Sequence, residues 1–207
     1  MHAPAEHHQI RIASAVKAAV EEAALITETC MEAEGREDDV FRKEFPWSHA
    51  LCHPSERRLR ELLVASLWEM GVVRGYPVVL VGRRFPPECL VLSVLCDVAP
   101  LALPRMARAI LDEDDFRRLD DAAFRMSRTT SIRIVDETHI EAAAPILRGR
   151  LDPQKWPCGP FVISDTVLSS GDIGTAAALC AMLPCTIIDP SGIVQTTGRW
   201  RLHHSSR

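Results

Sequence analysis

Hydrophobic positions recur with helical spacing near the start of the chain. Between Gln9 and Glu34 the apolar residues repeat every three or four positions, and charged residues occupy the other faces. The apolar stripe consists of Ile10, Ala13, Val16, Val20, Ala23, Ile26 and Cys30. This spacing predicts a long amphipathic helix of about seven turns. Gly35 is expected to end it, and the charged stretch 36–43 is expected to form a turn.

Beyond residue 43, apolar runs of strand length alternate with helical patterns. The predicted strands cover 47–52, 76–82, 131–135, 161–164 and 185–188. The predicted helices cover 54–70, 87–98, 103–110, 114–127, 137–148 and 174–182. Such alternation is typical of an α/β fold with a mainly parallel sheet covered by helices on both faces. We therefore expect an N-terminal helix with a charged linker (1–43), an α/β domain (44–198) and a tail (199–207).

Composition and charge narrow the class of protein. The 207 residues are 47% hydrophobic, and 24 Lys and Arg against 28 Asp and Glu give a formal net charge of −4. These values argue against a disordered chain and against a protein that coats nucleic acid. No targeting segment and no apolar run of the roughly 20 residues that span a membrane is visible, so we expect a cytoplasmic protein without a membrane partner. The seven cysteines lack CxxC spacing, so neither a disulfide framework nor a zinc site is predicted.

The segment 74–137 carries a series of landmarks in a fixed order. They are Gly75, Pro77 and Val78 at the start of a strand, Gly82 to Phe85 at its end, Asp112 to Phe116 with Leu119 at a helix start, and Ile132, Ile134 and Asp136 in a later strand. This order resembles the RecA-type motor domain of the DnaB family of replicative DNA helicases. The resemblance extends over about 47–191 and implies a RecA-like, P-loop-NTPase-type fold.

In that family, residues 52–59 would correspond to the phosphate-binding loop. Such a loop needs glycines that let backbone N–H groups surround phosphates, a lysine for the β- and γ-phosphates, and a Ser or Thr for Mg²⁺. Here 36–70 contains no glycine, Arg58 holds the lysine position, and Leu59, which cannot ligate a cation, holds the magnesium position. Glu56 would add negative charge beside the phosphates.

The other catalytic positions implied by the resemblance are also altered. Arg84 stands where the family's general base would be, and a guanidinium cannot accept a proton at neutral pH. The magnesium-associated aspartate falls on Ser164, with Asp165 displaced by one residue and therefore turned to the other face of the strand. Pro190 takes the place of a phosphate-sensing glutamine. Together these changes imply that ATP hydrolysis is lost.

A cluster of polar residues remains at the start of the predicted helix 54–70. His53, Ser55, Arg57 and Arg58 form either a degenerate nucleotide or anion site at a helix N-terminus or an ordinary solvated helix face.

Further polar residues follow the predicted strands. Arg83 and Arg84 end a central strand, where open α/β sheets bind ligands, although Arg84 could instead pair with Asp165 and close the site. Asp136 and Glu137 end another strand, either as a metal pair or as solvated carboxylates.

We therefore expect a catalytically inactive, helicase-like protein that needs no cofactor and acts by protein–protein association in DNA replication or repair. The partner is a second copy, bound through the long N-terminal helix, or another protein. Only weak DNA binding is expected from the net charge of −4. One alternative is a divergent ATP-dependent DNA helicase that uses ATP and Mg²⁺ with Arg58 in place of lysine. Another is an unrelated small-molecule α/β enzyme with Arg84, Asp136 and Asp165 at its strand ends.

Overall fold

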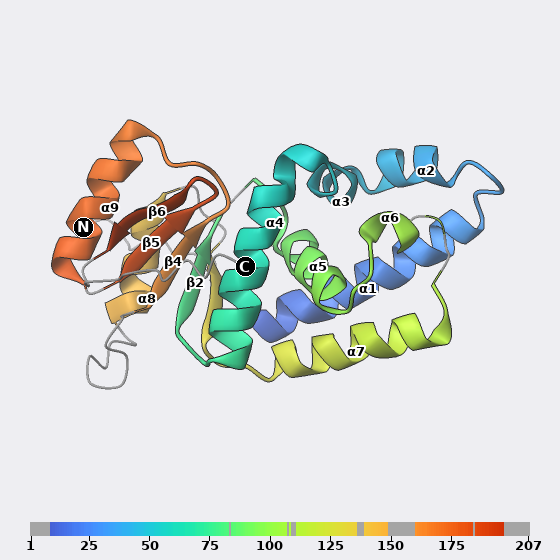
Figure 1. The fold of residues 1–207 in the computed structure, drawn as a ribbon, viewed down its shortest axis with the longest axis horizontal. Coiled ribbons are helices and arrows are strands. Elements are labelled where there is room, and N and C mark those ends of the chain that lie inside the picture. The colour runs from blue at the N-terminus through green and yellow to red at the C-terminus, as the bar shows by residue number, and fades with distance from the viewer. Residues whose placement is uncertain are drawn as a thin grey trace, which may run out of the picture.

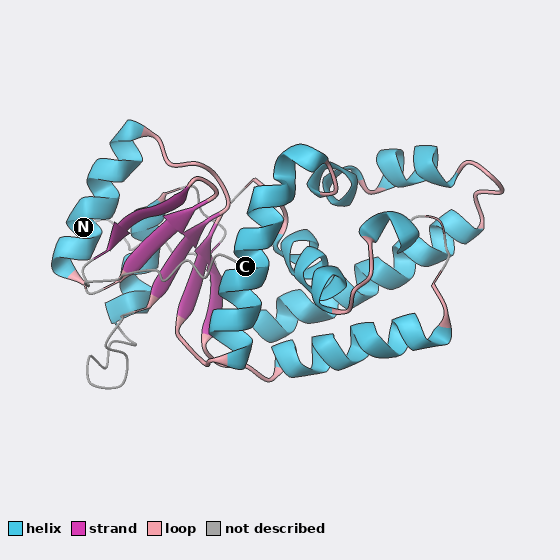
Figure 2. Ribbon diagram, in the orientation of Figure 1, coloured by secondary structure: helices cyan, strands magenta, loops and turns pink. Residues whose placement is uncertain are grey.

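A six-stranded mixed sheet lies between two groups of helices (Figures 1 and 2). The computed structural model describes residues 9–82, 84–106, 108, 111–135, 139–148, 160–183 and 185–196. The strands are β1 (Gln9–Arg11), β2 (Val78–Val81), β3 (Ile132–Val135), β4 (Phe161–Ser164), β5 (Thr186–Asp189) and β6 (Gly192–Thr196), in the order β1-β3-β2-β4-β5-β6. The four central strands are parallel, and β1 and β6 run antiparallel to their neighbours. The predicted α/β class with a mostly parallel sheet is confirmed.

Helices cover both faces of this sheet. They are α1 (Ile12–Met31), α2 (Glu37–Glu44), α3 (Pro46–Leu51), η1 (Pro54–Glu56), α4 (Arg57–Leu63), η2 (Val64–Val73), α5 (Pro87–Val98), α6 (Leu103–Met106), α7 (Glu113–Ser127), η3 (Ile140–Ala143), α8 (Ala144–Arg148) and α9 (Ser170–Met182). Figure 1 shows α1 to α7 gathered on one side of the sheet, with α8 and α9 on the other. The long N-terminal helix is therefore present, and residues 9–11, which were predicted as its first turn, form β1 instead.

Alternating strand residues build a separate apolar core on each face of the sheet. Val78 and Leu80 of β2 face the larger core, which contains α1, α5 and α7, whereas Val79 and Val81 face the core under α8 and α9. Val16, Ala23, Ile26 and Cys30 of the predicted stripe are buried in the larger core against α5 and α7, whereas Ala13 is exposed. Ile12, Ala15 and Ala19 complete the buried face of α1. This face is therefore not available for the association that the sequence suggested, and the boundary predicted at residue 43 stays a prediction.

Helix α4 continues without a break into η2, a rare π-helix in which hydrogen bonds span five residues. The N–H of Arg74, for example, donates to the carbonyl of Glu69 at 3.1 Å. Gly71 lies directly against β3, because a Cβ at this position would come within 2.7 Å of the side chain of Ile132. The hydroxyl of Ser131 donates to the carbonyl of Gly71 at 2.9 Å. A side chain larger than hydrogen would require either η2 or the Ile132 side chain to move.

Two predictions on the linker side of the fold were wrong. The predicted turn 36–43 is the helix α2, whose acidic first turn and basic last turn match the helix dipole and whose Phe41 is buried. The predicted strand 47–52 is the helix α3, which begins at Pro46, a residue favoured at a first helical position. The short outer strands β1 and β6 were not predicted.

Candidate functional site

The carboxyl ends of β2 and β4 form the natural ligand crevice of this topology. The two strands are hydrogen-bonded neighbours, and the chain leaves them toward opposite faces, through α5 after β2 and through α9 after β4. Open α/β sheets bind ligands at such a switch point. Arg84 and Asp165 follow the two strands, so the structure brings these two predicted site residues together.

The carboxylate of Asp165 fills this crevice. Its side chain is only 1% exposed, and its Oδ2 accepts hydrogen bonds from the backbone N–H groups of Arg84 at 2.9 Å and Phe85 at 3.4 Å. Burial raises the pKa of Asp165, although these N–H groups and the Arg84 guanidinium act in the opposite direction. Gly82 makes room for the carboxylate, because a Cβ at this position would lie 2.6 Å or less from both of its oxygens.

A buried carboxylate from the preceding helical region also enters the site. Both terminal nitrogens of the Arg84 guanidinium bind the Glu56 carboxylate, with Nη1 donating to Oε2 at 2.9 Å and Nη2 to Oε1 at 2.5 Å. The guanidinium also lies over the Phe85 ring, 4.9 Å from its centroid. Of the two interpretations of Arg84, pairing with an acid agrees with these contacts, but the acid is Glu56, and Asp165 binds the backbone N–H of Arg84 instead of its side chain.

The segment 52–59 is helical from Pro54 onward, and His53 before it is extended. It follows the helix α3 rather than a strand, passes through the 3₁₀ turn η1 and enters α4. None of its residues has a positive φ. His53 caps η1, because its Nδ1 accepts from the Ser55 N–H at 3.3 Å and lies 2.8 Å from the Ser55 hydroxyl. The Ser55 amide is therefore satisfied by the chain itself.

The two arginines predicted for an anion site lie on the exposed side of α4. Arg57 Nε donates to Glu61 Oε1 at 2.8 Å, one helical turn further along. Arg58 is exposed and, within the described part of the chain, forms no ion pair. The structure thus groups His53 and Ser55 with Glu56, and it leaves the cations facing solvent, as in the solvated-face interpretation.

Arg83, Asp136 and Glu137 lie outside the described residues. Within the described ranges, no group of three or more His, Cys, Asp or Glu side chains is placed to hold a metal ion. The predictions for these positions therefore stay predictions.

Sequence reasoning missed the roles of Glu56 and Gly82. Glu56 had been noted only as an unfavourable charge beside a phosphate, although its side chain forms the ion pair that closes the crevice. Gly82 was noted only as one of the landmarks of the helicase resemblance. A glycine at the end of a strand, directly before two arginines, was the one sequence signal that another group lies close to the backbone here.

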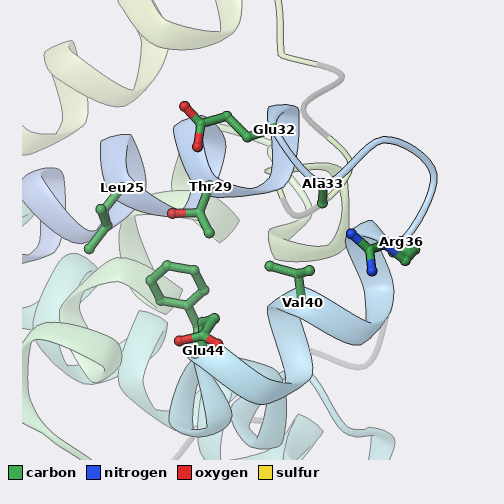
Figure 3. A pocket seen from close by; sticks show the side chains of 8 residues that line it. Leu25, Thr29, Glu32, Ala33, Arg36, Val40 and Glu44 are labelled. Carbon is green, nitrogen blue, oxygen red and sulfur yellow. The ribbon is translucent and has the colours of Figure 1, made fainter.

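Two hollows lie away from this crevice. A groove of about 570 Å³ runs between η2 and the β4–β6 part of the sheet, and its floor is mainly apolar, with Met70, Phe161 and Ile188 among its residues. A cleft of about 480 Å³ separates α1 from α2, and Figure 3 shows Thr29 on one helix across from Val40 on the other. Two glutamates and one arginine line this cleft with apolar residues, a mixture that does not favour an anion such as a nucleotide.

The outer face of α9 is uncharged. Asp172, which belongs to the N-terminal capping box, is the single charged residue of this helix. The exposed positions include Ile173, Gly174, Ala177, Ala178, Ala181 and Met182, and Val167 lies exposed just before the helix. Figure 1 shows α9 as the outermost helix on its side of the sheet. Exposed apolar surface of this kind is typical of an interaction site.

No described helix combines the length and apolar character that crossing a membrane requires.

Comparisons with known proteins do not assign the chain to a family. Searches against family models, curated proteins and solved structures find no match.

Proposed function

We propose that this protein is a RecA-like relative of the DnaB-type helicase motor that does not hydrolyse ATP and acts by associating with a second copy of itself. The observation that carries the proposal is the closed crevice at the ends of β2 and β4. Asp165 and Glu56 occupy it, and each is held by hydrogen bonds from the loop after β2.

Charge in the crevice opposes a nucleotide. Among the residues that the structure describes in the crevice, Glu56 and Asp165 supply two carboxyl groups and Arg84 supplies one guanidinium. Two like unit charges 5 Å apart repel by about 3 kcal/mol at an effective dielectric constant of 20. A triphosphate would therefore have to displace one carboxylate or to overcome its repulsion, and the segment 52–59 does not form a loop whose N–H groups could compensate.

The same contacts weaken the small-molecule enzyme alternative. Arg84 and Asp165, two of the groups that it requires, are both bound to groups of the protein itself. A substrate would have to compete with Glu56 for the half-exposed Arg84 guanidinium, and it would have to displace backbone contacts to reach the buried Asp165 carboxylate.

Calorimetric titration with ATP and Mg²⁺ tests the first half of the proposal. We expect no binding at millimolar nucleotide and no ATP turnover. Nucleotide binding together with a turnover that Arg58→Ala abolishes would contradict the proposal and establish the divergent ATPase. Because Arg58 is exposed and makes no described ion pair, this substitution leaves the fold unchanged. Turnover that persists in the Arg58→Ala variant at an unchanged rate, with no calorimetric binding, identifies a contaminating ATPase and agrees with the proposal.

The second half of the proposal places self-association on the outer face of α9. In a two-fold symmetric contact, each surface meets its own copy, so a charged face would meet like charges. The α9 face avoids this repulsion because Ile173, Met182 and the small residues between them carry no charge. A contact of one helix face is small, and we therefore expect a weak, concentration-dependent dimer.

Sedimentation equilibrium over a range of protein concentrations tests this surface. Met182→Glu should shift the protein to monomer, because it places like charges across the contact. Met31→Glu is the matched control, since Met31 is 68% exposed, against 61% for Met182, but lies at the end of α1. A wild-type protein that stays monomeric at the highest concentration, or an equal effect of both substitutions, would contradict association through α9.

A further inference from the structure

Two cysteine thiols meet at the end of α9. Cys180 lies in the last turn of α9, and Cys185 comes immediately before β5. Their sulfur atoms are 3.5 Å apart, and both residues are buried. The Cys180 thiol also lies 3.5 Å from the backbone carbonyl of Cys185. The two residues lie on either side of the end of α9 at Met182, five positions apart in the sequence.

Other described cysteines have different partners. Cys96 Sγ lies 3.4 Å from the thioether sulfur of Met106. Cys89 Sγ lies 3.5 Å from both the Ser48 hydroxyl and the Glu22 carboxylate. Neither contact offers a second thiol, so the juxtaposition at α9 differs from these in its chemistry.

The two thiols at α9 also influence each other's ionisation. A hydrogen bond from Cys185 stabilises the Cys180 thiolate and lowers the pKa of Cys180, whereas the same bond and burial raise the pKa of Cys185. By contrast, burial raises the pKa of Cys89 to about 12 and that of Cys52 to about 11. The thiolate is the form that reacts with oxidants, so the lowered pKa favours Cys180 over Cys89 and Cys52 as the thiol that a small oxidant attacks.

We propose that Cys180 and Cys185 are a redox modification site, at which a hydroperoxide such as H₂O₂ forms a reversible intramolecular disulfide. This inference does not rest on the proposed function, because the site lies at the helix–strand junction and needs neither a nucleotide nor a second copy.

The reaction balances in two steps. The Cys180 thiolate attacks one peroxide oxygen, the O–O bond breaks, and a sulfenic acid forms while the leaving hydroxide takes a proton to become water. The Cys185 sulfur then attacks Cys180 Sγ, the S–S bond forms, and the S–O bond breaks with loss of a second water. Two thiols thus lose two electrons and two protons, and one H₂O₂ becomes two waters. A dithiol reductant reverses the change by thiol–disulfide exchange.

The disulfide would tie the last turn of α9 to the start of β5. Cross-linking a loop as short as 180–185 restricts the unfolded chain modestly, and we expect the Tm to rise by about 5 °C. Because α9 packs on the core beneath the sheet through Ala176 and Leu179, the bond would fix the helix end against that core.

Peroxide treatment of the full-length protein, followed by alkylation under denaturing conditions and peptide mass spectrometry, tests the proposal. We expect a loss of about 2 Da, a peptide cross-linked between Cys180 and Cys185, and full recovery after dithiothreitol. Cys180 should react faster than Cys89, which is equally buried at 3% exposure.

Two variants give the proposal a sharp contrast. In Cys185→Ser, oxidation of Cys180 should stop at a sulfenic acid that dimedone traps. In the matched control Cys89→Ser, the 180–185 cross-link should form as in the wild type. The proposal is overturned if wild-type Cys180 oxidises without a cross-link to Cys185, if the cross-link joins two molecules, or if Cys180 reacts no faster than Cys89. The wild-type measurement decides the matter even if a variant fails to fold.

Discussion

Replacing Asp165 separates the two tasks of its side chain, which are to accept hydrogen bonds and to carry a charge. Asp165→Ala removes the acceptor from the backbone N–H groups of Arg84 and Phe85. Leaving a buried donor unsatisfied costs about 1–3 kcal/mol, and the Arg84 N–H is only partly buried. We therefore expect a loss of about 2–3 kcal/mol, which corresponds to a fall in Tm of about 5–10 °C.

Asp165→Asn keeps an oxygen acceptor and removes the charge. Because burial raises the folded-state pKa of Asp165 above its unfolded value, the ionised carboxylate is less stable in the fold than in water. Its protonation therefore stabilises the wild type. This contribution is fully present below the unfolded pKa and is lost as the pH rises through the folded pKa. At pH 7 we expect the Asn variant to be at least as stable as the wild type, within about 1 kcal/mol.

Thermal unfolding followed by circular dichroism, between pH 4 and pH 8, checks both effects. As the pH falls, the Tm of the wild type should rise relative to the Tm of the Asn variant. The reasoning is refuted if Asn destabilises the protein as much as Ala does at pH 7, or if the wild type loses stability relative to Asn on acidification. Either result would mean that the charge of Asp165 is favourable in the crevice.

Three further substitutions test other parts of the fold by chemical denaturation. Gly71→Ala should cost about 1–3 kcal/mol, because the added Cβ meets Ile132, and a neutral effect would show that η2 can shift freely. Asp112 caps α7, because its Oδ1 accepts a hydrogen bond from the backbone N–H of Asp115 at 2.8 Å. Asp112→Ala should therefore cost about 1 kcal/mol, whereas Asp112→Asn should be nearly neutral. Arg84→Ala should cost about 1–2 kcal/mol because it leaves the buried Glu56 unpaired, and the loss should largely disappear in the background Glu56→Gln.

The central strands could be predicted from the sequence, whereas the outer strands could not. All four residues of β2 and of β4 are buried, and the two strands read as apolar runs, VVLV in β2 and FVI followed by Ser164 in β4. β1 has three residues, and β6 mixes apolar and polar residues because it lies at the edge of the sheet. Tertiary packing also decided α3, where a pattern compatible with a strand forms a helix with Leu51 buried.

The candidate site could be predicted only in part. Arg84 and Asp165 were expected at one end of the sheet because parallel strands place their carboxyl ends together. The pairing of Arg84 with Glu56 depends on how α3 and η1 turn the chain toward β2, and no local pattern encodes that turn. The contact of Cys180 with Cys185 was missed for a similar reason, since it depends on where α9 ends relative to β5.

The antiparallel outer strands restrict how copies of this protein can combine. β1 and β6 are three and five residues long, and each covers one side of the parallel centre. A strand of three residues such as β1 offers few free backbone groups as a template for a strand from another molecule, whereas β6 has an ordinary strand length. Extension of the sheet between molecules is therefore disfavoured on the β1 side. Copies that meet beside β1 would do so through side chains rather than by continuing the sheet.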